Sequence, residues 1–345
     1  MENLWLVWAS SGIFLWALAN VLDNYFTEDS YPDEYTGLAI SALFNFFPVV
    51  FILVFVSPDL PRILWVELEV KEIAFGKVGE VANVVNFLKI SFSFNKGVFA
   101  AFASGVLLMI TYLAYFKCLF SFNDNVALQI AWCLSSPLIL LMGWFFLGDD
   151  LTVVQYVGAG LIFLGVLFLD FRKFEFKKGF GAYVTWALVM NFAYSFHEIL
   201  MKVAYEIENI PFWTAFLFFI FGQLTVGVAS VILRWKTVWG QRRQLKQMIK
   251  RFWLVFVIAE IIGQTAALCT QRAVNGAPFV SLYGALEAGM PIYVLLTGFV
   301  FSLILRIPCF NKRKVGEIIW GNFKVDLKRK LLATAIVVAG VFLLT

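Results

Sequence analysis

The chain has few of the residues on which metal sites, disulfides and most active sites depend. It holds one histidine and four cysteines in 345 residues. The cysteines show no paired spacing, and a single histidine cannot complete a zinc or haem site with them. The sequence also lacks a glycine-rich phosphate loop and a recognisable Ser-His-Asp pattern. We therefore expect no metal, no cofactor and no enzymatic activity.

Charge is also scarce, and apolar residues take its place. Charged residues make up 14% of the chain and hydrophobic residues 61%, and the mean hydropathy is +0.83. A water-soluble core of this size does not need so much apolar sequence, and no stretch has the composition of a separate soluble domain. The composition predicts an all-α integral membrane protein that is embedded in a lipid bilayer and binds no nucleic acid.

Apolar runs long enough to cross about 30 Å of hydrocarbon occur all along the chain. They lie near residues 3–22, 36–56, 98–120, 125–147, 152–170, 180–204, 211–233, 253–271, 279–305 and 331–345. The last run is short, but Lys328, Arg329 and Lys330 can snorkel and extend it. We predict about ten transmembrane helices in a multi-pass protein of the cell (inner) membrane.

The two halves of the chain repeat each other. The segment Leu161–Asp170 reads LIFLGVLFLD, and Ile336–Thr345 reads IVVAGVFLLT. Further matches in the same order pair Gly165 with Gly340, Pro137 with Pro291, Trp16 with Tyr194 and Asn20 with Glu198. The extra residues fall in the polar loops 57–97 and 306–330, where insertions are tolerated best. We predict two inverted five-helix repeats, residues 1–170 and 180–345.

The first half also carries the motifs of a known family. They are Asn125-Val126-Ala127, Ser136-Pro137, the run FFLGDDLT from Phe145 to Thr152, and the glycines from Gly158 to Gly165. They resemble the EamA-type domain of the drug/metabolite transporter superfamily, and Glu287, Pro291 and Gly340 repeat the pattern. Asp150 stands where the family commonly has a glutamate, whereas the second half departs at Leu305-Arg306. The resemblance implies a carrier whose substrate binds near the bilayer midplane, between the halves.

Ionisable residues inside the apolar runs mark candidate sites, because a charge at mid-membrane costs about 2.5 to 3.5 kcal/mol on insertion scales. Asn191, Ser195, Glu198 and Lys202 share one face of the sixth predicted helix, and His197 lies about 100° away. Two interpretations are open for this stripe. Either it lines a cavity, or Glu198 and Lys202 neutralise each other one turn apart.

Two more carboxylates lie well inside apolar runs. Glu260 is one turn from Gln264, and Glu287 is one turn from Tyr283, with no basic residue within a turn of either acid. Carboxyl groups in such places can take up and release protons, as a proton-coupled carrier requires. The alternative is a protonated acid that is hydrogen-bonded to a neighbouring helix. His197 could belong to the same relay or be a structural residue.

The first half supplies a facing set of amphipathic side chains, namely Trp16 and Asn20 on the first helix and Gln129 and Trp132 on the fourth. They suit a substrate with an apolar body and a few polar atoms. The basic residues near the spans, Lys117, Lys202 and Arg272, lie toward helix ends, which argues against a phosphate-bearing substrate. We predict a secondary transporter, monomeric or homodimeric, that moves a small neutral, zwitterionic or cationic metabolite by alternating access, with protons as the candidate coupling ion.

Two other classes fit the same sequence. One is a receptor-like or structural membrane protein on this fold, and the other is an intramembrane enzyme that uses His197 and the carboxylates. Orientation is open too, because most Lys and Arg follow odd-numbered helices, which places both termini outside. The family resemblance implies cytoplasmic termini instead.

Local patterns give smaller predictions. Thr152 and Gln155 fit a capping box at the start of the fifth helix, and Asp149 and Asp150 favour the positive end of its dipole. Glycines 158, 160, 165 and 340 are expected at close helix contacts. In the loops, residues 315–327 alternate as in a β-hairpin, and residues 62–94 suit an interfacial helix or strands.

Overall fold

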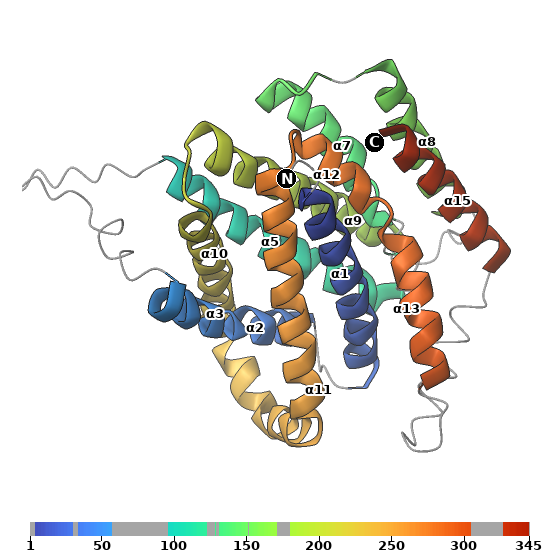
Figure 1. The fold of residues 1–345 in the computed structure, drawn as a ribbon. Helices are drawn as coiled ribbons and strands as arrows, with labels where there is room; N and C mark the ends of the chain where they lie inside the picture. Colours follow the sequence, from blue (N-terminus) through green and yellow to red (C-terminus); the bar gives the residue numbers. More distant parts are fainter. Residues whose placement is uncertain are drawn as a thin grey trace, which may run out of the picture.

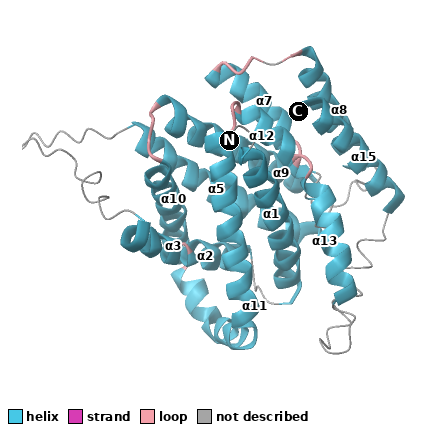
Figure 2. Cartoon of the chain, in the orientation of Figure 1, coloured by secondary structure: helices cyan, strands magenta, loops and turns pink. Residues whose placement is uncertain are grey.

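The computed structural model describes residues 4–29, 34–56, 96–122, 128, 131–150, 152–170, 180–304 and 327–344. Within these ranges the chain is helical, and short loops join the helices (Figure 1, Figure 2). The predicted hairpin in 315–327 and the predicted interfacial segment 62–94 lie outside the described residues, apart from Leu327, which begins a helix.

The elements follow the predicted apolar runs, with η marking π-helical turns. They are α1 (Leu4–Asp29), α2 (Glu34–Phe44), α3 (Phe46–Phe51), η1 (Ile52–Val56), α5 (Lys96–Phe122), α7 (Ser135–Met142), η3 (Gly143–Leu147), α8 (Val153–Asp170), α9 (Phe180–Lys202), η4 (Val203–Ile207), α10 (Phe212–Leu233), α11 (Trp235–Gly276), α12 (Val280–Glu287), α13 (Met290–Ile304) and α15 (Leu327–Leu344).

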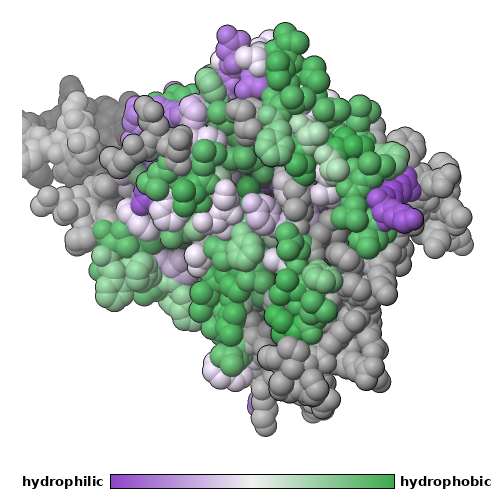
Figure 3. Space-filling model, turned by 45° about the vertical axis from the view of Figure 1, so that its right-hand side comes forward, coloured by the Kyte–Doolittle hydropathy of each residue, from purple (hydrophilic) through white to green (hydrophobic). Residues whose placement is uncertain are grey.

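Within the described residues, four helical stretches are long and apolar enough to cross a membrane by themselves. They are Leu4–Asp23, Glu34–Val56, Lys96–Ser121 and Phe212–Leu233. Large apolar side chains such as Phe47, Phe55 and Phe145 are exposed, and hydrophobic atoms cover much of the described surface in the view of Figure 3. A soluble monomer rarely exposes so much apolar surface. The chain is therefore a helical membrane protein.

One predicted loop is a helix. The basic stretch 234–251 was expected to join the seventh and eighth helices, but α11 runs through it as one helix of 42 residues. The stretch is rich in Lys, Arg and Gln, which are good helix formers. Hydropathy marks where a chain can cross lipid, and it does not mark where a helix ends.

Three helices break shortly before a proline. The chain turns at Asn45 before Pro48, at residues 133–134 before Pro137, and at residues 288–289 before Pro291. Proline lacks an N–H and its ring crowds the carbonyl four residues earlier, so the helix kinks there. Two of these breaks lie beside polar side chains. Asn45 is in the first break, and Glu287 ends α12 just before the third.

The helices pack in pairs. α1 lies along α11, α5 lies along α9 and α10, and α8 lies along α15, while α7 contacts both α9 and α12 (Figure 1). Glycine permits the closest of these approaches. A Cβ added to Gly105 would overlap the Phe219 carbonyl on α10, and one added to Gly222 would overlap the Phe102 carbonyl on α5. Close backbone contact of this kind is a usual way for helices to associate in lipid.

The crossing of α8 and α15 also depends on glycine. A Cβ on Gly165 would lie 2.8 Å from Val337 Cγ2, and a Cβ on Gly340 would lie 2.7 Å from the Gly158 carbonyl oxygen. The expectation for Gly160 was wrong, because a Cβ there would meet nothing within 4 Å. Gly160 shares a helix with Gly165, but it lies on a different face.

These glycines give a matched pair of variants. We expect Gly340→Ala to lower the free energy of unfolding by about 1 to 3 kcal/mol, because the added methyl group meets backbone that cannot move aside easily. Gly160→Ala should leave stability unchanged or raise it slightly, since alanine favours helix. Thermal unfolding of the two purified variants in detergent measures the difference. Equal melting temperatures would contradict the observed crossing.

The link between η3 and α8 joins distant parts of the chain. The capping box is confirmed: the Thr152 N–H donates to Gln155 Oε1 at 2.8 Å, and the Gln155 N–H donates to Thr152 Oγ1 at 3.4 Å. Asp149 has a partner that the sequence did not indicate. Its Oδ2 accepts a hydrogen bond from Ser281 Oγ at 2.5 Å, at the start of α12. Asp149 is 5% exposed, whereas Asp150 points to the exterior.

We expect Asp149→Ala to destabilise the protein by about 1.5 to 3 kcal/mol, the usual value of a hydrogen bond to a charged group. Asp150→Ala is the neighbouring control and should change stability by less than about 0.5 kcal/mol, because the side chain is exposed. Denaturation in mixed micelles would show the difference. A larger effect at Asp150 would refute the assigned tie to Ser281.

Candidate functional site

A cavity lies among the helices where α1, α2, α5 and α11 face α9, α10 and α12. It holds about 950 Å³ of space not filled by atoms, counting the space at its open side. The predicted site residues that line it are Trp16, Asn20, Trp132, Tyr194, Glu260, Gln264 and Glu287. Residues far apart in the sequence therefore converge on one space, as expected for a small-molecule site.

One part of the cavity lining is a network of polar side chains centred on Asn45. Its Nδ2 donates to Gln223 Oε1 at 3.2 Å, and its Oδ1 accepts from Gln264 Nε2 at 2.9 Å. Ser41 Oγ donates to Glu260 Oε1 at 2.6 Å. The network joins α2, α10 and α11, and the break before Pro48 is what turns Asn45 into it.

Another part of the lining is aromatic and holds a second carboxylate. Tyr194 Oη donates to Glu287 Oε1 at 2.6 Å, and the Tyr194 ring lies 4.9 Å from the Trp132 ring. Trp16 lies 5.9 Å from Tyr112, and its Nε1 donates to Thr270 at 3.1 Å. Two buried polar atoms of lining residues, Glu287 Oε2 and Trp132 Nε1, have no hydrogen-bond partner. Such atoms are where a ligand can bind.

The cavity has acidic side chains without a basic counterpart. Asp23, Glu260 and Glu287 line it, and its described lining includes no Lys, Arg or His. The nearby basic groups are used elsewhere: Lys117 pairs with Glu34 at 2.9 Å, and the Arg272 guanidinium lies 3.6 Å from the centre of the Phe212 ring. The arrangement favours cationic or neutral ligands over anions.

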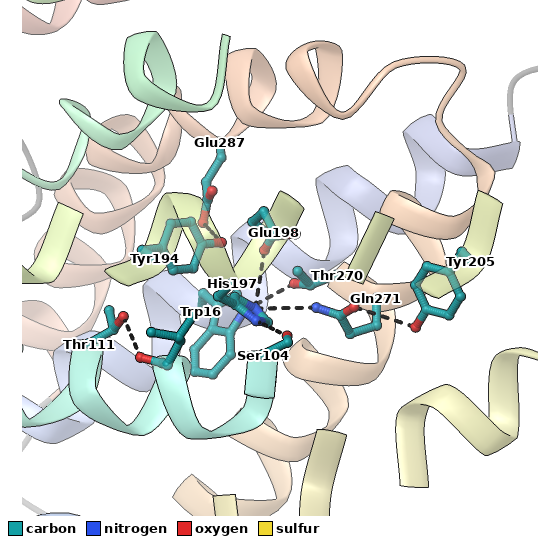
Figure 4. A network of polar contacts seen from close by, with 11 residues as sticks. Trp16, Ser104, Thr111, Tyr194, His197, Glu198, Tyr205, Thr270, Gln271 and Glu287 are labelled. Atoms are coloured by element: carbon teal, nitrogen blue, oxygen red, sulfur yellow. Dashed lines mark hydrogen bonds and ion pairs between the residues drawn. The ribbon is translucent and has the colours of Figure 1, made fainter. Parts of the chain in front are cut away.

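A second group of polar side chains is buried behind the cavity, between α5, α9 and α11 (Figure 4). His197 Nδ1 lies 2.5 Å from Ser104 Oγ, and His197 Nε2 lies 3.4 Å from both Gln271 Nε2 and Glu198 Oε1. The imidazole stacks on Phe219 at 5.3 Å. Glu198 is 0% exposed and neither carboxyl oxygen has a hydrogen-bond partner.

Serine, histidine and glutamate side by side have the composition of a hydrolytic triad, but the placement does not suit one. A serine nucleophile must reach its substrate, and Ser104 is fully buried and does not line the cavity. The geometry therefore gives the enzymatic interpretation no support. Among the described residues, no three His, Cys, Asp or Glu side chains gather to hold a metal ion.

The polar stripe on α9 holds helices together, contrary to the cavity-lining interpretation. Asn191 Nδ2 donates to the Ala131 carbonyl at 3.2 Å, and Ser195 Oγ donates to the Ser135 carbonyl at 3.2 Å. Both acceptors flank the proline break near α7, where helical hydrogen bonding is interrupted. Of the predicted residues on α9, only Tyr194 lines the cavity.

The suggested pairing of Glu198 with Lys202 also differs from the structure. Lys202 Nζ lies 2.5 Å from Glu206 and donates to the carbonyl oxygens of Val274 and Ala277. Lys202 thus secures the end of α11, and His197 is the basic neighbour of Glu198. Tyr283 is fully buried but does not line the cavity, and Gln129 lies outside the described residues.

Several lining residues were not predicted: Asp23, Ser41, Asn45, Tyr112, Tyr115 and Gln223. A signal existed for two of them. Asn45 precedes Pro48 by three residues inside an apolar run. Asp23 directly follows the first apolar run, and in the structure it is helical because α1 continues to Asp29. The tyrosines are common at membrane interfaces, so their presence alone indicates no site.

Comparison with known proteins adds nothing to this picture. No protein-family model matches the chain, and no curated protein matches it.

Proposed function

We propose that the chain is a secondary transporter that moves a small neutral, zwitterionic or cationic metabolite by alternating access, coupled to protons. The observation that carries the proposal is the cavity, which is lined by helices from residues 1–170 and from residues 180–345. A site between two halves can face either side of a membrane in turn when the halves rock against each other.

The packing supports two inverted repeats with five helices each. The pair of α1 and α11 has its counterpart in the pair of α9 and α5, whereas the close pair of α5 and α10 is matched only by a slight contact of α11 with α2. Gly165 faces Ala333 and Val337, and Gly340 faces Gly158 and Ile162. Each glycine contacts the residues that stand three and seven positions before the other glycine. Because the two sets of contacts match, α8 and α15 cross about a two-fold axis.

Two broken helices contact each other. α7 and the residues before it break near Pro137, α12 and α13 break near Pro291, and α7 contacts α12. Discontinuous helices at a repeat interface are typical of secondary carriers, because unwound backbone near mid-membrane can contact a substrate. The matched prolines place one break in each half.

The EamA resemblance of the first half agrees with this proposal. It implies the same pairing of five-helix halves and a cell-membrane location. The link that resembles the family carries Asp149 and Asp150, and Asp149 joins it to α12 of the other half.

The proposal can be tested in liposomes that contain a pH-sensitive dye. We would add amino acids, nucleosides and cationic aromatic compounds in turn and record substrate-dependent proton movement. Wild-type protein should give a signal with at least one class, and Glu260→Gln and Glu287→Gln should abolish or reduce it. The absence of both proton movement and tracer exchange for every class, with folded protein, would refute transport.

A further inference from the structure

The cavity combines three carboxylates with an aromatic wall, and we propose that its substrate is an organic cation, an ammonium group on an apolar or aromatic body. This inference rests on the proposed function and narrows it from three substrate classes to one. It depends on the charge and the ring geometry of the lining residues.

The carboxylates are poorly compensated. Asp23 and Glu260 are close enough to interact unfavourably, and Glu287 interacts in the same way with Glu198 behind it. Glu287 is 3% exposed, and its Oε2 has no hydrogen-bond partner. Buried charges are costly unless they are paired. A positive ligand or bound protons relieve this cost, and both can compete for the same carboxyl groups.

The aromatic residues supply a surface that a bare proton or metal ion does not need. The Trp132 ring contacts two tyrosine rings, with centroid distances of 6.0 Å to Tyr115 and 4.9 Å to Tyr194. The Trp16 ring lies 5.9 Å from the Tyr112 ring. Aromatic faces attract ammonium groups and form the cages that recognise quaternary ammonium ligands. Glu287 stands beside this surface through its bond to Tyr194.

Other ligand classes fit less well. An anion would meet repulsion from all three acids, and the carboxylate of a zwitterion would find no basic side chain in the described lining. A neutral ligand would leave bound protons alone to neutralise the three acids, so it would gain no attraction from them. A metal ion requires several oxygen ligands around one point, and no such group of three occurs among the described residues.

A pair of probes of the same shape tests the charge directly. Benzyltrimethylammonium and neopentylbenzene differ by the replacement of the charged nitrogen with carbon. Equilibrium dialysis of radiolabelled benzyltrimethylammonium with the full-length protein in detergent should show saturable binding. Unlabelled neopentylbenzene, phenylalanine and benzoate should each compete about tenfold less well or worse than the unlabelled cation.

Variants then locate the site. Glu287→Gln and Glu260→Gln should each weaken binding of the cation about tenfold or more, and Asp150→Asn, which changes an exposed acid, should leave it unchanged. Glu287→Asp keeps the charge, so it serves if the glutamine variant fails to fold. Equal competition by neopentylbenzene, or displacement by NaCl at the same concentration as the cation, would overturn the inference.

The outcome separates the inference from the proposed function. If phenylalanine or a nucleoside is transported while the cation neither binds nor moves, the organic-cation inference is wrong and transport stands. If the cation binds with the expected dependence on Glu287 but crosses no membrane, transport is wrong and the binding site stands.

Discussion

Replacing Glu287 by glutamine is expected to lower the initial rate of transport by about a hundredfold or more. Glu287 is buried at the break between α12 and α13, its Oε1 accepts from Tyr194, and its Oε2 has no hydrogen-bond partner. Glutamine keeps the size of the side chain and removes both the charge and the exchangeable proton. Tracer uptake into liposomes, with equal amounts of folded protein, measures the loss.

Two controls separate this effect from a packing change. Tyr194→Phe keeps the ring against Trp132 and removes one hydrogen bond to Glu287, so it should reduce the rate by about tenfold or less. Asp150→Asn changes an exposed acid and should transport at the wild-type rate. If Glu287→Gln transports as well as the wild type, Glu287 has no part in binding or coupling.

The second large effect is expected at Glu198, which lies behind the cavity. Glu198→Gln should stop proton movement while leaving substrate exchange and probe binding within about threefold of the wild type. Glu198 lies beside His197 on its own helix. It is also near enough to interact electrostatically with Glu287 on α12 and with Tyr194, Tyr205 and Tyr283. A proton on either carboxyl group relieves the repulsion between Glu198 and Glu287, which links the two sites.

Proton flux and tracer exchange measured on the same liposomes show whether Glu198→Gln loses proton movement and keeps substrate exchange. His197→Gln is the companion variant, because it keeps a hydrogen-bonding side chain beside Ser104 and cannot carry a positive charge. Loss of probe binding in Glu198→Gln would place that residue in the substrate site. Normal proton flux in both variants would make the buried pair structural.

Most of the helices and a third of the cavity lining could be predicted because lipid imposes simple rules. Apolar runs of sufficient length become helices, and an acid inside such a run stands out, which is how Glu260 and Glu287 were found. The match of Trp16 with Tyr194 singled out two aromatic residues among many, and both line the cavity.

The rest depends on which helices become neighbours, and the sequence does not contain that information in readable form. The stripe of Asn191 and Ser195 was correctly placed on one face of α9, but that face packs against the broken helix near Pro137. Gln223 carries no charge, so the sequence does not distinguish it, and the place of Asn45 before Pro48 does not reveal that the two side chains meet. Gly160 and Gly165 belong to the same helix, and only the position of α15 shows that Gly165 is at a close contact and Gly160 is not.

Solute counterflow tests the central claim, transport by alternating access, most directly. Liposomes loaded with unlabelled benzyltrimethylammonium, phenylalanine or adenosine would be diluted into a trace of the same labelled compound. A carrier gives a transient accumulation of label above equilibrium, because each inward step is paired with an outward one. We predict this overshoot with benzyltrimethylammonium and its loss in Glu287→Gln. Simple equilibration or no uptake of all three compounds, with folded protein in the membrane, would contradict the account.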